Sequence, residues 1–337
     1  PRMTMCVPTD RSCTSTRTSS ARSRSPTNNW NVTERTQSPH FLIHTHRTMA
    51  SSPARKKQKK TKTVKFSLTI SSHAILKSVC DVLDSLVSTF QFVVVQNENF
   101  QGLKVRQMDD GLSSLTSVRY ACQVECPHGQ SSFMVAKTMF RAYLGQNAAT
   151  AVLKILQYEG EDCIHFFSLD DDHNCTDAYS CSLLDWEGPD EDEADDLVCE
   201  HTLEMDLTIL GRFLKLSQTG PSSADDVRFK LLQHKGSKEM LFQMAYQQTA
   251  NMRGSRLFKF HGDQQVNHED IDFDDYAILY SQSFSVDFLR RFIKHLDKDR
   301  KLTIGLQEDK PLCVNYNLGV EKSVIRFYLA PKVDDMA

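Results

Sequence analysis

Acidic side chains beside a histidine are the residues of this sequence whose spacing could perform catalysis. Asp170, Asp172 and His173 offer two carboxylates and an imidazole in one short run, and such groups can hold Mg²⁺ for hydrolysis. The run falls between two predicted strands, where acidic residues are ordinary turn formers. Asp270–Asp275 is a similar acidic run, which we interpret as a solvated loop. A metal-dependent hydrolase that uses Asp170, Asp172 and His173 is therefore only a distant alternative.

The ten cysteines could bind a metal or form disulfides, but no two of them have CxxC spacing. The nearest approach to a ligand set is Cys122, Cys126 and His128. Structural zinc takes four ligands, and no second pair stands at a usual distance from these three. The sequence also lacks a P-loop, a Gly-x-Ser-x-Gly elbow and a glycine-rich dinucleotide loop. We therefore predict a non-catalytic chain with reduced, scattered thiols and with no metal or cofactor.

Charge is divided unevenly along the chain. Residues 1–64 carry 13 basic and two acidic residues, whereas the rest of the chain carries 27 basic and 41 acidic residues. This division excludes a uniformly basic, histone-like DNA-binding protein, and the 40% of apolar residues excludes a wholly disordered chain. No run approaches the roughly 18 consecutive apolar residues of a membrane-spanning helix.

The first 64 residues are rich in Ser, Thr, Arg and Pro, and they have almost no hydrophobic periodicity. Such a segment is expected to be a disordered basic leader. Met49 is followed by Ala-Ser-Ser-Pro, as at a start of translation, so it stays open whether residues 1–48 are translated. A compact basic cluster near the end of the leader favours nuclear targeting over a merely solvated tail. The cluster consists of Arg55, Lys56, Lys57, Lys59 and Lys60.

Beyond the leader, segments with helical spacing alternate with pairs of short strands. Apolar residues recur with a helical period in residues 75–86, 151–156, 207–216 and 284–294. After each of the last three segments come a strand, an acidic or glycine-containing turn and a second strand. This recurrence predicts an internally repeated α+β fold, with helices on one face of antiparallel sheets. The acidic run within residues 187–198 marks a connector between an N-terminal domain, 65–186, and a C-terminal domain, 199–335.

Basic residues concentrate on the four predicted helices, whereas acidic residues crowd the turns and the connector. Seven basic residues lie on these helices: Lys77, Lys154, Arg212, Lys215, Arg290, Arg291 and Lys294. A repeated set of basic helices on an acidic body could face a polyanion while the acidic surface repels nonspecific partners. Most such lysines and arginines merely keep a helix face solvated, so the pattern alone leaves both interpretations open.

The end of the chain resembles that of proliferating cell nuclear antigen, the eukaryotic sliding clamp. The most specific part is Tyr328-Leu-Ala-Pro-Lys332, which is followed by an aliphatic residue and two acidic residues. Residues 102–109 resemble an early strand pair of that family, and residues 152–164 resemble a helix-to-strand junction in its first domain. The resemblance covers roughly residues 65–335, mostly at the level of pattern, with strong identity only near the end.

This resemblance implies a DNA-clamp fold of two similar domains, closed head to tail into a ring of three around double-stranded DNA. It implies a nuclear, non-catalytic processivity factor for DNA polymerase and a docking platform for replication and repair proteins. Helices of such clamps line the hole and contact phosphates without reading sequence. Lys77, Lys154 and Lys294 match channel lysines of the family. Arg212 and Lys215 lie on the third predicted helix, but not at the positions of the family's arginines. Arg290 and Arg291 are basic residues additional to those of the family.

The resemblance also implies an apolar pocket for short peptide motifs of polymerases, clamp loaders, ligases and nucleases. By position its wall would consist of Met108, Leu115, Tyr328, Ala330, Pro331 and Val333. The alternative is that Met108, Leu115 and Tyr328 are simply core residues. Residues 170–200 form a shorter and more acidic middle segment than the family has. A subunit of the heterotrimeric DNA-damage checkpoint clamp therefore remains an alternative, although the intact tail favours the homotrimer.

Overall fold

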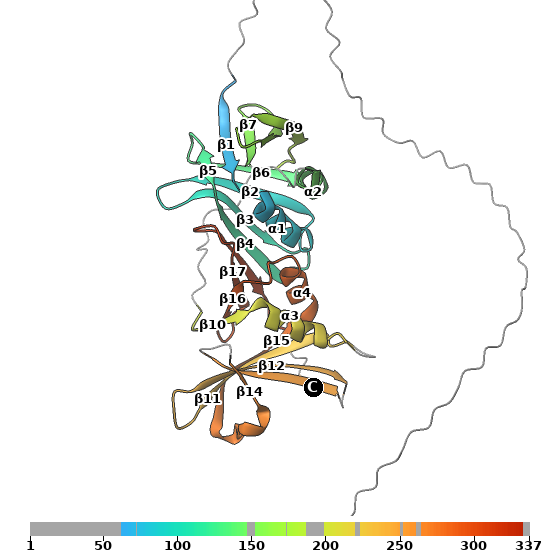
Figure 1. The fold of residues 1–337 in the computed structure, drawn as a ribbon, viewed down its shortest axis with the longest axis vertical. Coiled ribbons are helices and arrows are strands. Elements are labelled where there is room, and N and C mark those ends of the chain that lie inside the picture. The colour runs from blue at the N-terminus through green and yellow to red at the C-terminus, as the bar shows by residue number, and fades with distance from the viewer. Residues whose placement is uncertain are drawn as a thin grey trace, which may run out of the picture. The chain divides into compact units, whose positions relative to one another are not determined.

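The computed structural model describes eight stretches of the chain, which belong to one unit of residues 60–337 (Figure 1). They are residues 62–71, 73–146, 152–172, 174–186, 199–219, 223–249, 252–260 and 264–332. The basic cluster at 55–60, His173, the acidic run at 187–198 and Val333 lie outside the described residues. The roles assigned to them from the sequence therefore stay predictions.

A sheet of eight described strands runs through the middle of this unit, and we call it the central sheet. Its order is β10-β16-β17-β18-β4-β3-β2-β6. One half comes from the second part of the chain: β10 (His201–Asp206), β16 (Lys301–Leu306), β17 (Leu312–Asn317) and β18 (Val324–Leu329). The other half comes from the first part: β4 (Ser114–Ala121), β3 (Gln101–Met108), β2 (Thr89–Gln96) and β6 (Gln130–Ala136). The two halves meet where β18 pairs with β4, with Tyr328 opposite Leu115.

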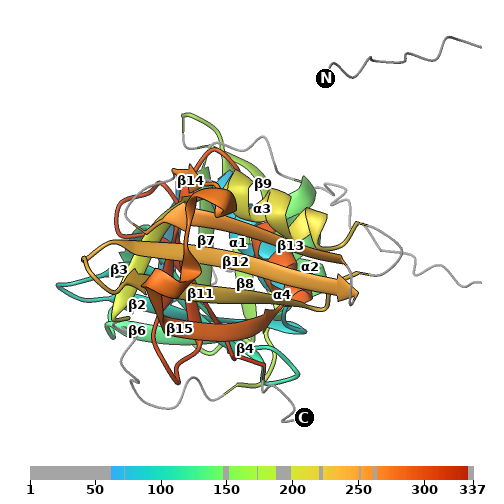
Figure 2. The same cartoon turned by 90° about the horizontal axis from the view of Figure 1, so that it is seen from below.

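Two further antiparallel sheets each contain five described strands. The N-terminal sheet has the order β5 (Gln123–Glu125), β1 (Val64–Ile70), β7 (Val152–Tyr158), β8 (Cys163–Leu169) and β9 (Cys175–Ser182). The C-terminal sheet has the order β14 (Gln265–Val266), β13 (Met252–Lys259), β12 (Met240–Thr249), β11 (Asp226–His234) and β15 (Tyr276–Ser285), and Figure 2 shows β11, β12 and β13 side by side. Each half of the chain thus supplies one whole sheet and half of the central sheet, which is the internal repeat predicted from the sequence.

The described α-helices pack together in pairs on one side of the central sheet, as Figure 1 shows. They are α1 (His73–Asp84), α2 (Lys137–Gln146), α3 (Leu207–Leu216) and α4 (Val286–Ile293). Helix α1 contacts α2, α3 contacts α4, and α1 also contacts α4. Phe292 of α4 stacks on Phe327 of β18 with ring centroids 4.6 Å apart, and this contact fixes α4 to the inner face of the sheet. None of the described helices is both long enough and apolar enough to cross a membrane.

The helix predicted from Ala151 to Leu156 is wrong, because residues 152–156 belong to strand β7. A short apolar run such as Val-Leu-Lys-Ile-Leu fits a strand and a helix equally well, and β-branched Val152 and Ile155 favour the strand. Pairing with β1 on one side and β8 on the other decides the outcome. The helix lies upstream instead, in α2.

Candidate nucleic-acid interface

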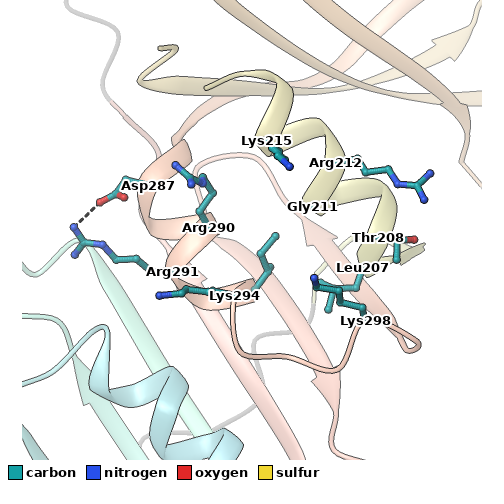
Figure 3. Close-up of a pocket in the computed structure, with 11 residues that line it drawn as sticks. Leu207, Thr208, Gly211, Arg212, Lys215, Asp287, Arg290, Arg291, Lys294 and Lys298 are labelled. Atoms are coloured by element: carbon teal, nitrogen blue, oxygen red, sulfur yellow. Dashed lines mark ion pairs between the residues drawn. The ribbon is translucent and has the colours of Figure 1, made fainter. Parts of the chain in front are cut away.

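Helices α3 and α4 enclose an open cleft of about 770 Å³, which we call the α3–α4 cleft (Figure 3). Both helices are amphipathic, and each buries one apolar face against the rest of the protein. The buried residues are Leu207, Leu210, Phe213 and Leu214 of α3 and Val286, Leu289, Phe292 and Ile293 of α4. The opposite, exposed faces therefore carry the charged residues of both helices toward the cleft. Six basic residues line it: Arg212, Lys215, Arg290, Arg291, Lys294 and Lys298. Lys298, in the turn after α4, was not singled out from the sequence.

The α3–α4 cleft keeps most of this positive charge uncompensated. Asp287 is the one acidic residue among its lining residues, and its Oδ2 lies 2.5 Å from Nη2 of Arg291. Arg290 donates a hydrogen bond to the neutral Gln218 side chain over 3.1 Å. In the part of the chain that the structure describes, Arg212, Lys215 and Lys294 form no ion pair. Like charges gathered in a concave site raise the local positive potential and attract polyanions.

The other helix pair carries charge that is largely compensated. Asp81 lies 2.8 Å from the Lys77 ammonium and 3.2 Å from the Arg141 guanidinium. Asp84 lies 2.5 Å from the Arg141 guanidinium and 3.5 Å from the Lys137 ammonium. Lys77, which the resemblance places in a DNA channel, is thus held beside the Asp81 carboxylate. Lys137 and Arg141 were not identified, since α2 itself was missed.

Lys154 lies on strand β7, in register with Thr69 of β1. The helix on which its DNA contact was predicted does not exist at this position. The structure therefore brings together the predicted basic residues of α3 and α4, places Lys77 among the compensated charges of α1 and α2, and puts Lys154 on a strand instead of a helix.

Three of the predicted pocket residues form one row across the central sheet. Met108 of β3 is paired with Leu115 of β4, which is paired with Tyr328 of β18. Their side chains lie on the outer face, because their strand neighbours Gln107, Thr116 and Phe327 are buried on the inner, helix-covered face. Met108 is 49% exposed, and Leu115 and Tyr328 are half-buried, so the three are not ordinary core residues.

The chain beyond β18 remains close to this row. The Ala330 N–H donates to the Ser113 carbonyl over 2.9 Å, and the Lys332 N–H donates to the Ser283 carbonyl over 2.8 Å. Ala330 is exposed and Pro331 is half-buried. The segment after Tyr328 thus runs from the central sheet to the end of β15.

Among the residues that the structure describes, the other candidate clusters do not converge into a metal-binding group. Asp170 accepts hydrogen bonds from the backbone N–H groups of Asp172 and Asn174, as an aspartate does in a tight turn. Burial raises the pKa of the Cys122 thiol to about 12. His128 lies 3.6 Å from Glu159 instead of turning toward Cys122 and Cys126. Among the described residues, the group that does converge is Glu161, Cys163 and His165.

No family model and no curated protein sequence matches this chain. A solved structure does: PCNA from Thermococcus kodakaraensis, with a TM-score of 0.61 and 15% sequence identity. The match covers 79% of this chain and 100% of that one. At this identity the likeness concerns the fold. Mainly antiparallel sheets with few helices, arranged as in PCNA, give this chain the α+β DNA-clamp fold predicted from its sequence.

Proposed function

We propose that this chain is a non-catalytic sliding-clamp subunit that encircles double-stranded DNA and keeps DNA polymerase on its template. The observation that carries the proposal is the α3–α4 cleft on a clamp fold. Six basic side chains and only one carboxylate are among the residues that line this cleft. Lysine and arginine contacts to phosphates are sequence-independent and salt-sensitive, so a protein held by them can slide along DNA. A nuclear location also belongs to the proposal; it rests on the basic cluster at 55–60, and microscopy of a tagged chain would test it.

Two sheet edges that no described strand fully covers support closure into a head-to-tail ring of three. Strand β9 is the last strand of the N-terminal sheet, and nearly all its residues are exposed. Strand β13 is covered by β14 only at Leu257 and Phe258. Unpaired edges are a liability that pairing between subunits removes. The charges are complementary, because β9 carries Asp177 and β13 carries Arg253 and Arg256.

Retention on end-blocked DNA would test encirclement. A ring should thread onto linear duplex DNA through its free ends, and streptavidin added to biotinylated ends should then trap it. We expect the protein to survive a high-salt wash on the blocked DNA and to be lost from the same DNA with open ends, because salt weakens phosphate contacts but not topological linkage. Equal release from both DNAs would mean ordinary electrostatic binding and would contradict the proposal.

We further propose that the outer-face row of Met108, Leu115 and Tyr328 docks short peptide motifs of polymerases, clamp loaders, ligases and nucleases. An apolar row beside the extended segment after β18 suits a peptide with apolar anchors. Tyrosines at the centre of such interfaces often carry much of the binding energy.

Tyr328→Ala is expected to weaken binding of a ligase-derived clamp-binding peptide by about 30-fold or more, since a central aromatic anchor contributes roughly 2 kcal/mol or more. The neighbouring Phe327→Ala is the matched comparison. Phe327 is fully buried against Phe292, so its loss should cost about 3–5 kcal/mol of unfolding free energy. Calorimetric titration and thermal melts separate the two effects. Unchanged peptide binding by a folded Tyr328→Ala variant would rule out this docking surface.

The checkpoint-clamp subunit remains the second candidate, and one observation favours it. The α1–α2 pair carries compensated charge, unlike the α3–α4 cleft, which would suit a ring whose other subunits supply different channel charges. The hydrolase alternative would need Asp170 to hold a cation, and that carboxylate accepts backbone hydrogen bonds in the turn between β8 and β9. The oligomeric state of the purified chain separates the two clamp functions.

A further inference from the structure

Three chemically different metal-binding side chains meet where strand β8 begins. Cys163 and His165 are two residues apart on β8, so they point to the same face of the N-terminal sheet. Glu161 lies in the turn just before the strand and reaches back over them. All three are half-buried, with side-chain exposures of 23% for Glu161 and 21% for His165. The group is therefore reachable from solvent without being fully solvated.

The donor atoms of these side chains already lie at short mutual distances. The Cys163 Sγ is 3.5 Å from the His165 Nε2 and 3.8 Å from the Glu161 Oε2. The His165 Nε2 is 2.8 Å from the same Glu161 Oε2. The three atoms thus form a small triangle with one thiol sulfur, one imidazole nitrogen and one carboxylate oxygen.

We infer that Glu161, Cys163 and His165 form a binding site for a zinc-like divalent cation. Bonds of about 2.0 Å to nitrogen and oxygen and about 2.3 Å to sulfur put tetrahedral donor atoms roughly 3.3–3.6 Å apart. The two distances to sulfur are close to these values, and the nitrogen–oxygen hydrogen bond must open by about half an ångström when the cation replaces its proton. Thiolate and imidazole ligands select zinc over magnesium or calcium.

Neighbouring side chains already orient the ligands. The other nitrogen of His165, Nδ1, lies 2.7 Å from the Ser180 hydroxyl on β9, which fixes the ring so that Nε2 faces the cation. The Lys62 ammonium contacts the Glu161 Oε1, so Oε2 remains directed toward the imidazole. Three protein ligands leave a fourth position for water, as in open zinc sites.

The same geometry speaks against a nucleophilic cysteine. In a Cys-His-acid arrangement the two imidazole nitrogens serve different partners, one the thiol and the other the carboxylate. Here a single nitrogen, Nε2, faces both the Cys163 sulfur and the Glu161 carboxylate. Burial and the adjacent Glu161 carboxylate also raise the pKa of the Cys163 thiol. A cation that binds here must displace the thiol proton to solvent.

Cobalt(II) titration of the full-length, metal-free chain would test the site. A thiolate bound to Co²⁺ gives a near-ultraviolet charge-transfer band, and we expect this band to grow until one equivalent is bound. Zn²⁺ should then displace the Co²⁺ and raise the melting temperature, whereas Mg²⁺ should do neither. Ser180→Ala should weaken binding by about tenfold, because it removes the partner that orients His165.

Cys163→Ser is expected to abolish the band, and Glu161→Gln should weaken binding without removing the thiol. Cys175→Ser is the matched control, since Cys175 is an exposed cysteine of the adjacent strand β9 outside the triangle. Its band should equal that of the unaltered chain. An absent band in the unaltered chain, or an undiminished one in Cys163→Ser, would overturn the assignment.

Discussion

Ala178→Pro and Ser255→Pro are each expected to convert a three-subunit ring into monomers, whereas an equimolar mixture of the two variants should form dimers. Ala178 lies on the open edge strand β9, and Ser255 lies on the uncovered part of β13. In the proposed head-to-tail ring, β9 of one subunit would pair with β13 of the next. Each variant blocks one of these edges and leaves the other intact.

The hydrogen-bond pattern of β9 identifies the position to change. The Leu183 N–H donates to the Asp162 carbonyl over 3.0 Å, so residue 183 points its N–H toward the body of the sheet. Residues along an antiparallel edge alternate, which turns the N–H groups of Ala178 and Ser180 outward. Proline at Ala178 therefore removes an outward donor without breaking the bonds to β8, and edge strands tolerate such prolines. Ala178→Val keeps the N–H and should remain trimeric.

The same alternation applies to β13. The Phe260 N–H donates to the Met240 carbonyl, and the Lys259 N–H donates outward to the Gln264 carbonyl. The N–H of Ser255, four residues before Lys259, therefore also points outward. The Ser255 side chain accepts a hydrogen bond from Gln243 at an exposed position, and its loss should cost little stability.

Light scattering of the full-length proteins measures the mass of all five samples: the unaltered chain, the two proline variants, their mixture and Ala178→Val. In the mixture, the intact β13 of Ala178→Pro can pair with the intact β9 of Ser255→Pro, and the remaining edges are both blocked. A mixture that stays monomeric although both variants are folded would exclude β9–β13 pairing. An unaltered chain that stays monomeric over a dilution series would contradict the homotrimer and favour the checkpoint-clamp subunit.

Three of the helices could be predicted because their apolar residues recur over two or three turns. Helices α1, α3 and α4 were identified on this signal. Helix α2 carried the same signal in Phe140, Tyr143 and Leu144, which are buried at helical spacing, but it was overlooked. Ala151–Leu156 shows the limit of such patterns, since only pairing with β1 and β8 distinguishes a short apolar strand from a helix.

The candidate sites also contain some features that could be found from the sequence and others that could not. The basic residues of α3 and α4 could be found from the sequence, because charge on an amphipathic helix lies opposite its apolar face. The compensation of charge between α1 and α2 could not be found, because its partners Asp84 and Arg141 are 57 residues apart in the chain. Cys163 and His165 alternate along one strand, a spacing that can be read from the sequence although neither residue was singled out there. Their orienting partner Ser180 comes from the next strand and required the β8–β9 register.

Neutralising the α3–α4 cleft is expected to remove most of the electrostatic part of DNA binding. In the variant Arg212→Gln, Lys215→Gln, Lys294→Gln, three exposed cations without an ion pair among the described residues are lost. Each phosphate contact contributes about 0.9 to the slope of log K against log salt, so the slope should become shallower by roughly three. At 0.1 M salt this change in slope corresponds to a loss of about two to three orders of magnitude in DNA affinity. Fluorescence anisotropy with a short duplex measures both quantities.

The control variant is Lys77→Gln combined with Asp81→Asn, which removes the ion pairs of Asp81 with Lys77 and Arg141 without changing the net charge of α1. The salt slope should stay the same within about half a unit, because a lysine already held by a carboxylate releases no counterion from DNA. Both variants alter exposed or half-buried helix residues, so their melting temperatures should remain close to that of the unaltered chain. If the control lost as much slope as the cleft variant, the duplex would contact both helix pairs alike. If neither variant changed the slope, DNA would have to bind a different face, and the α3–α4 cleft would no longer support a clamp function.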